Sequence, residues 1–291
     1  MIFSLLEILA PVFIMAGIGF AWTKSGRPLD TNQFTPLIVW IGSPCLIFSA
    51  LMKSNIGLDD LTEIAWVALG IHLCAAVLGV VALKILRLPV RAFLPALTLP
   101  NTGNMGLSLC LFAFGDVGLA LGVAYFTVSA LLQFTFGVSV SANRFSWKRA
   151  IATPHIYAIA AAVAMLWTDT PVPVWIGNTV SLLGQFTIPL MLLFLGVSLA
   201  KLTVGAVGRA VILSVVRIGG GLAIGLGFVW LAGLDGTAAG IVLIQASMPV
   251  AVFNYLLAQY YDNSPAEVAG LVVVSTVMSF ATLPLLLAVI L

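Results

Sequence analysis

Two prolines interrupt long apolar stretches of this chain, and polar residues surround both of them. Pro100 is followed by Asn-Thr-Gly-Asn104, while Pro249 is preceded by Gln245-Ala-Ser-Met and followed, after four more residues, by Asn254. In hydrocarbon, a helix is broken only where protein or a water-filled cavity satisfies the freed backbone groups. Two such breaks at corresponding places in two halves of a chain indicate the binding site of a transporter.

The remaining composition is that of a membrane protein with many spans. Hydrophobic residues make up 62% of the 291 residues and charged residues only 8%, with a mean hydropathy of +1.18. Soluble domains have about 25% charged residues. The three cysteines lie in apolar segments without metal-ligand spacing, so we expect no metal site. We also expect no nucleic-acid partner.

Ten windows are apolar over about the 20 residues that a spanning helix needs. We expect the first window to be a retained span, because the basic residues follow it instead of preceding it. The windows are 4–23, 34–53, 64–86, 93–114, 118–141, 154–169, 177–200, 207–231, 236–259 and 266–290.

Positive charge is distributed on one side of this pattern. Of the twelve Lys and Arg, ten fall in or beside the connections between windows 1 and 2, 3 and 4, 5 and 6, and 7 and 8. Only Lys53 falls on the opposite side, and Arg217 lies within a window. The positive-inside rule then predicts that these connections are cytoplasmic and that both termini lie on the outer side of the cell (inner) membrane.

The ten windows divide into two sets of five, and an odd number of spans inverts the second set relative to the first. The basic connector at 143–153 separates a first repeat at 1–142 from a second at 154–291. Residues 116–129 and 262–275 align without a gap, with four identities in fourteen positions. We therefore predict an all-α fold of ten transmembrane helices, built as two inverted five-helix repeats, whose broken helices 4 and 9 cross.

Broken helices offer particular chemistry at mid-membrane. A half-helix N-terminus presents free N–H groups and a partial positive charge, which suit an anion, and a C-terminus presents carbonyl oxygens, which suit a cation. If the helices cross at Pro100 and Pro249, polar side chains from both meet there, without a full counter-charge. The candidate substrate-binding residues are Asn101, Thr102, Asn104, Gln245, Ser247 and Asn254. The alternative is that these groups, Thr102 and Ser247 especially, only repair the broken backbone.

These motifs resemble the auxin efflux carrier family, which includes the plant PIN carriers and their bacterial relatives. The resemblance rests on Thr98-Leu-Pro100-Asn-Thr-Gly-Asn-Met-Gly106, on Gln245-Ala-Ser-Met-Pro249 and on Ser264-Pro265, and it covers essentially the whole chain. It implies ten spans in two inverted repeats, a scaffold half and a transport half, and an organic anion bound where helices 4 and 9 cross. It also implies that Asn101 contacts the substrate.

Three departures from the family pattern narrow what the resemblance implies. Ser108 stands where many members have proline, and Asp59, Asp60 and Glu63 have no lysine partner of the kind found in the plant proteins. The central hydrophilic loop is also only a few residues long. Plant-type auxin recognition is therefore not implied, and the bacterial members are associated with dicarboxylates such as malate or malonate.

Two charged residues inside the spans remain open. Arg217, about ten residues into its window, either acts in transport or extends toward the cytoplasmic face. Glu7 is interfacial or takes part in proton coupling. His72 and His155 have no carboxylate at helical spacing, so we expect packing or interfacial positions for them.

The main hypothesis is a secondary transporter of small organic anions, and not an enzyme, because no span groups a nucleophile with a base or a set of metal ligands. A channel would need a continuous polar lining. The alternative is a sodium or proton antiporter on the same broken helices, although no Asp or Glu lies within ten residues of either proline. The expected partners are a small carboxylate and the lipid bilayer. Proton or sodium coupling and a homodimer both remain open, and no other cofactor is expected.

Overall fold

The computed structural model describes residues 2–27, 29, 31–53, 56–144, 154–202 and 206–291. Within these residues every regular element is a helix or a π-helical turn, apart from one isolated antiparallel bridge. The elements up to the middle of the chain are α1 (Ile2–Lys24), α2 (Thr31–Leu37), η1 (Ile38–Gly42), α3 (Ser43–Lys53), α4 (Leu58–Ile85), α5 (Val90–Thr98), η2 (Thr102–Leu107), α6 (Ser108–Leu132), η3 (Gln133–Gly137) and α7 (Val138–Ala142). The others are α9 (Pro154–Trp167), α10 (Val174–Gln185), α11 (Thr187–Lys201), α12 (Val207–Ala232), α13 (Gly236–Ala246), α14 (Val252–Tyr260) and α15 (Pro265–Ile290). Most of the expected connector at 143–153 lies outside the described residues.

Seven continuous helical stretches in the described residues are long and apolar enough to cross a membrane. They are Leu5–Lys24, Gln33–Lys53, Leu58–Ile85, Thr102–Ala142, Val174–Lys201, Val207–Ala232 and Pro265–Ile290. Pro154–Trp167 and Gly236–Ala246 are shorter apolar helices. The all-helical membrane architecture is confirmed, while the count of ten spans stays a prediction.

The stretch Thr102–Ala142 contains a reversal of the chain. Its 41 residues would extend about 60 Å as one helix, twice the hydrocarbon thickness. Gly115 has φ 63° and ψ −151°, a backbone conformation open to glycine alone. Beyond it, a Cβ added at Gly122 would lie 3.0 Å from the Cys110 sulfur, so the chain after Gly115 folds back along the chain before it.

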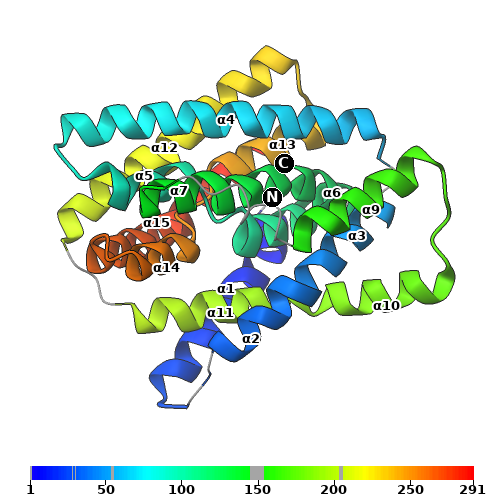
Figure 1. Cartoon of the computed structure of the whole chain (residues 1–291), viewed down its shortest axis with the longest axis horizontal. Helices are drawn as coiled ribbons and strands as arrows, with labels where there is room; N and C mark the ends of the chain where they lie inside the picture. Colours follow the sequence, from blue (N-terminus) through cyan, green and yellow to red (C-terminus); the bar gives the residue numbers. More distant parts are fainter. Residues whose placement is uncertain (1, 28, 30, 54–55, 145–153, 203–205) are drawn as a thin grey trace.

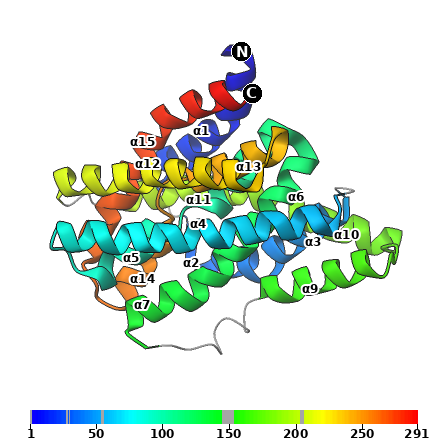
Figure 2. The ribbon, with the colours of Figure 1, turned by 90° about the horizontal axis from the view of Figure 1, so that it is seen from above.

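The helices form two groups. In the break group (α4–α7 and α12–α15), α4 packs against α5, α6 and α12, and α12 packs against α13 and α15. In the outer group (α1–α3 and α9–α11), α1 packs along α11, and α3 packs against α9 and α10. Figure 1 shows α4 along one side of the molecule and α1, α2 and α11 toward the other. In Figures 1 and 2 the two termini lie close together, where α1 begins beside the end of α15.

Hydrogen bonds join helix ends that are far apart in the sequence. The Lys201 ammonium donates to the Leu29 carbonyl at 3.1 Å. The Asn263 amide donates to the Ser141 carbonyl at 2.9 Å. Both pairs connect chain segments for which the charge pattern predicts the same, cytoplasmic, side.

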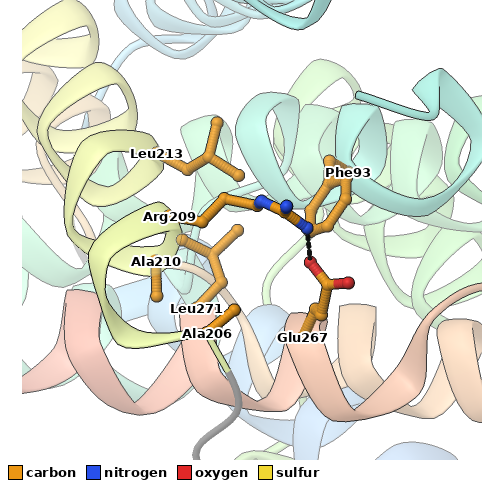
Figure 3. A pocket seen from close by; sticks show the side chains of 7 residues that line it. All are labelled: Phe93, Ala206, Arg209, Ala210, Leu213, Glu267 and Leu271. Carbon is orange, nitrogen blue, oxygen red and sulfur yellow. Dashed lines mark hydrogen bonds and ion pairs between the residues drawn. The ribbon is translucent and has the colours of Figure 1, made fainter. Parts of the chain in front are cut away.

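Two further contacts follow the same rule. Figure 3 shows Arg209 of α12 and Glu267 of α15 directed at one another beside Phe93, and they form an ion pair between the N-terminal turns of two helices with the same predicted side. The Lys53 ammonium donates to the Ser181 hydroxyl at 2.6 Å, and both residues are predicted to lie toward the outer side. The folded arrangement is thus compatible with the alternation that the charges predict.

Candidate functional site

The two proline-containing breaks contact each other. The backbone N–H of Asn101 donates to the Pro249 carbonyl at 2.8 Å, and Pro100 pairs with Val250 in the isolated antiparallel bridge. Neither proline has an N–H to donate, so each ends its helix and leaves a short extended segment. Pairing the two extended segments satisfies part of the backbone that the breaks free from the helices.

Asn101 occupies a tight turn at the first break. Its φ of −78° and ψ of 56°, with a hydrogen bond from the Thr102 N–H to the Pro100 carbonyl at 2.9 Å, make an inverse γ-turn. The Asn101 side chain is only 3% exposed, and its amide nitrogen has no hydrogen-bond partner among the described residues. A buried donor without a partner is costly, and the described residues leave the hydrogen-bonding capacity of this amide nitrogen unused.

A cavity of about 570 Å³ lies between the break group and the outer group. The break group contributes residues from the first break, from α6 and η3, and from α14 with Ala251 before it. The outer group contributes residues from α2 to α3, α9 and α11. The polar residues that line it are Thr35, Ser43, Asn101, Thr102, Asn104, Ser129, Gln133, His155, Ser198, Lys201, Tyr255 and Gln259. None of the described lining residues is Asp or Glu.

Four of the residues that the sequence singled out line this cavity, namely Pro100, Asn101, Thr102 and Asn104. They all come from the first break. The turn they form exposes one side to the cavity, while Gly106, one turn further on, lies against the Gln245 side chain. Any Cβ at Gly106 would overlap the Gln245 amide oxygen, so this glycine is required for the close approach.

The residues singled out around the second break lie behind the cavity, in protein interior. Gln245 is fully buried, and its side-chain nitrogen lies 3.4 Å from the Gly122 carbonyl. The Ser247 hydroxyl donates to Leu243 of its own helix at 2.7 Å. Pro249 itself does not line the cavity.

Asn254 connects the second break to the first. Its amide nitrogen donates to the Leu99 carbonyl at 2.9 Å, and its amide oxygen accepts a hydrogen bond from the Gln133 side chain at 3.2 Å. It thereby satisfies a carbonyl freed at the first break and positions Gln133, which lines the cavity. Asn254 itself is 3% exposed and does not line the cavity.

Arg217 of α12 lies at the ends of both broken helices. Its guanidinium donates to the Leu97 carbonyl at 2.7 Å and also to the Ala246 carbonyl. Leu97 is the last residue but one of α5, and Ala246 is the last residue of α13. With 2% of its surface exposed, Arg217 is directed into the protein and not toward an aqueous face. Glu7, in contrast, is exposed on α1 and does not line the cavity.

Most polar cavity residues were not among the sequence candidates, and Gln133, Lys201 and His155 are examples. Gln133 lies on η3 and Lys201 ends α11, so their spacing in the sequence gives no sign that they meet the first break. Lys201 is a charged residue of the lining, where the sequence suggested no full counter-charge, and its ammonium is bound to the Leu29 carbonyl. His155 is 6% exposed, its Nδ1 has no partner among the described residues, and its ring meets Phe126 edge-on at 6.0 Å between centroids.

His72 also has a defined role that sequence spacing could not show. Its Nδ1 lies 2.7 Å from the Ala68 carbonyl, and its Nε2 lies 3.0 Å from the hydroxyl of Ser129, which lines the cavity. The carbonyl requires the proton on Nδ1, so Nε2 accepts from the serine. No three His, Cys, Asp or Glu side chains come together as a metal site among the described residues.

Comparison with known proteins identifies the family of this chain. A family model described as "Membrane transport protein" matches residues 4–145 and 138–287. A protein of Methanothermobacter thermautotrophicus named "Uncharacterized transporter" is 25% identical over 274 residues, which cover 88% of each chain. An uncharacterized transporter of Methanocaldococcus jannaschii is 24% identical over 268 residues, which cover 86% of each chain. The chain therefore belongs to the membrane transport protein family, the family of the auxin efflux carriers.

Proposed function

We propose that the protein is a secondary transporter of small organic anions, which binds a carboxylate in the cavity beside Asn101. The observation that carries the proposal concerns Asn101, which lines a cavity of about 570 Å³ at a helix break and has a buried side-chain amide nitrogen without a partner among the described residues. That volume falls within the usual range of small-molecule sites. An amide donor there would bind a carboxylate oxygen, and the N-terminus of the second half-helix adds a favourable dipole.

The charge of the cavity supports an anion over a cation. Lys201 is the charged side chain among the described lining residues. Arg217 adds a second positive charge behind the first break, bound to Leu97. A sodium or proton antiporter, the alternative, would be expected to keep a carboxylate in the cavity, and the described lining has none.

The same proposal includes the topology. Ten spans, with helices 4 and 9 interrupted at Pro100 and Pro249, would form two inverted repeats with both termini on the outer side of the cell membrane. The reversal at Gly115 and the hydrogen bonds between helix ends support this alternation. Cysteines introduced at Ser146 and Thr170 of a cysteine-free protein should be labelled from the cytoplasmic and outer sides respectively. Labelling of both from one side would contradict the inverted repeat.

The position of the cavity suggests how access could alternate. Its walls come from two groups of helices, each packed mainly within itself. Movement of the break group against the outer group would open the cavity to one side and then to the other, as in other carriers with broken helices. The substrate would remain bound to the first break, which moves with α6 and α12.

Counterflow in proteoliposomes tests the function. Vesicles loaded with unlabelled malonate should accumulate labelled malonate or malate from outside, with saturation and competition between the two acids. Empty vesicles and vesicles loaded with an uncharged analogue such as malonamide are the controls. Uptake driven by sodium or proton gradients without any carboxylate, together with absence of counterflow, would favour the cation antiporter.

A further inference from the structure

Arg217 holds the carbonyl ends of both broken helices at once, through Leu97 of α5 and Ala246 of α13. We propose that its guanidinium is a resident cation at the helix breaks, which takes the place of a coupling sodium ion and allows the anion to bind without sodium. The part of this inference that concerns anion binding rests on the proposed function. The part that concerns the cation at the helix breaks does not depend on which ligand the protein binds.

The argument begins with the ends of the helices. The last carbonyls of a helix have no partner within it and carry a partial negative charge. In carriers with discontinuous helices, these carbonyl ends are where the coupling sodium or proton binds. Here Arg217 occupies one carbonyl from each helix, so these two oxygens are already bound to a positive charge.

The charge on Arg217 is not cancelled by an acid. Among the described residues, no carboxylate pairs with Arg217, and the ion pair that forms joins Arg209 to Glu267. Its side chain is 2% exposed. An isolated buried charge is costly, and two carbonyls at negative helix ends are the compensation available to it. Because the carbonyls are neutral groups, a net positive charge remains at the breaks.

Helix α12 is shaped for this contact. Gly221 lies one turn after Arg217, and a Cβ there would overlap both the Ala246 carbonyl and the guanidinium. A Cβ on Gly225, one turn further, would lie 3.0 Å from the Ala246 Cβ. Glycine at these positions lets α12 approach the end of α13 closely enough for an arginine to reach it. Gly219, by contrast, has no atom within 4 Å of an added Cβ.

The geometry also requires arginine specifically. A guanidinium is planar and presents several N–H groups in fixed directions, so it can bind two separate carbonyls, whereas an ammonium is a single point of charge. Arg217→Lys should keep the charge but bind the two helix ends unequally. The two half-helices would then be held together less firmly, and binding at Asn101 would weaken.

The first experiment uses the unmodified protein. Malonate binding and melting temperature are measured in sodium chloride and in choline chloride at equal ionic strength. We expect the same malonate affinity and the same melting temperature in both salts. A saturable increase of either quantity with sodium, not reproduced by choline, would overturn the proposal. The melting measurement without malonate remains informative even if malonate proves not to be a ligand, which separates this inference from the proposed function.

The second experiment removes the cation. Arg217→Ala leaves space and no charge, while Arg217→Met fills the space without charge. Both should weaken malonate binding by roughly 10- to 150-fold, the effect of losing hydrogen bonds from a charged group. Millimolar methylguanidinium should restore binding and melting temperature to Arg217→Ala, and it should have no effect on Arg217→Met or on the parent.

Restoration by the small cation in the alanine variant alone would support a resident cation, because a purely space-filling role would be served by methionine. Normal malonate binding by Arg217→Met would overturn it. If the alanine and methionine variants do not fold, Arg217→Lys decides. We expect it to bind malonate more weakly than the parent and still without sodium, and a sodium requirement in this variant or the parent would contradict the proposal.

Discussion

The two helix breaks look alike in the sequence but are satisfied in different ways. At the second break, the Val250 N–H donates to the Ser275 hydroxyl at 3.1 Å, and the Ser247 hydroxyl bonds within its own helix. At the first break, Asn101 lines the cavity, and its side-chain amide nitrogen is buried without a hydrogen-bond partner among the described residues. From this comparison we propose a division of roles, in which the second break mainly supports the structure and the first break binds the ligand.

Asn101→Asp should show the largest effect at the first break. It replaces a donor with an anion, so a bound carboxylate would lose a hydrogen bond and gain a like-charge repulsion. We expect malonate affinity to fall on the order of 100-fold or more. Labelled-malonate counterflow would show this as loss of uptake. Uptake by Asn101→Asp equal to that of the parent would remove Asn101 from the site.

Gly221→Ala should show a smaller effect, and this effect should be on stability, because Gly221 contacts the helix that ends at the second break. The added methyl group overlaps a backbone carbonyl of the second broken helix, so the helices must separate, at a cost of about 1–3 kcal/mol in stability. Gly219→Ala on the same helix meets open space and is the matched control. Thermal melting in detergent compares the two variants. Equal melting temperatures would mean that α12 does not hold the end of α13 as described.

Ser247→Ala should show the smallest effect. Its hydroxyl bonds only to the carbonyl four residues earlier in its own helix, and such a bond contributes little to helix stability. We expect a change within about 0.5 kcal/mol in stability and no change in malonate affinity. A clear loss of malonate binding in this variant would show that the second break also contacts the ligand, which would contradict the division of roles.

The sequence could predict the breaks but not this division. Pro100 and Pro249 indicate breaks because polar residues surround them, whereas Pro11, Pro95 and Pro284 also stand in apolar stretches and lie inside helices. The family follows from the motifs around the two breaks. Asn101 and Asn254 are equivalent by such reasoning, because both are amides near a break. Only the folded chain shows that Asn254 is used by the Leu99 carbonyl and that Asn101 remains unpartnered.

The rest of the cavity was inaccessible to sequence reasoning for a related reason. Gln133, His155 and Lys201 come from three different helices, and each is unremarkable in its own stretch of sequence. Their proximity to the first break depends on how the break group packs against the outer group. Arg217 stands out in the sequence as a charge within an apolar window, but its two carbonyl partners are 120 and 29 residues away.

The most direct test of the central claim compares Asn101→Ala with Asn254→Ala in one assay of malonate-induced thermal stabilisation. We predict that Asn101→Ala melts like the parent and binds malonate about 5- to 150-fold more weakly, because one hydrogen bond to the ligand is lost. Asn254→Ala should instead reduce the free energy of unfolding by about 1–3 kcal/mol, since it leaves the Leu99 carbonyl unsatisfied. Its melting temperature should therefore fall below that of the parent. Parent-like malonate affinity in Asn101→Ala would contradict the account, because the first break would then not be the site where the anion binds.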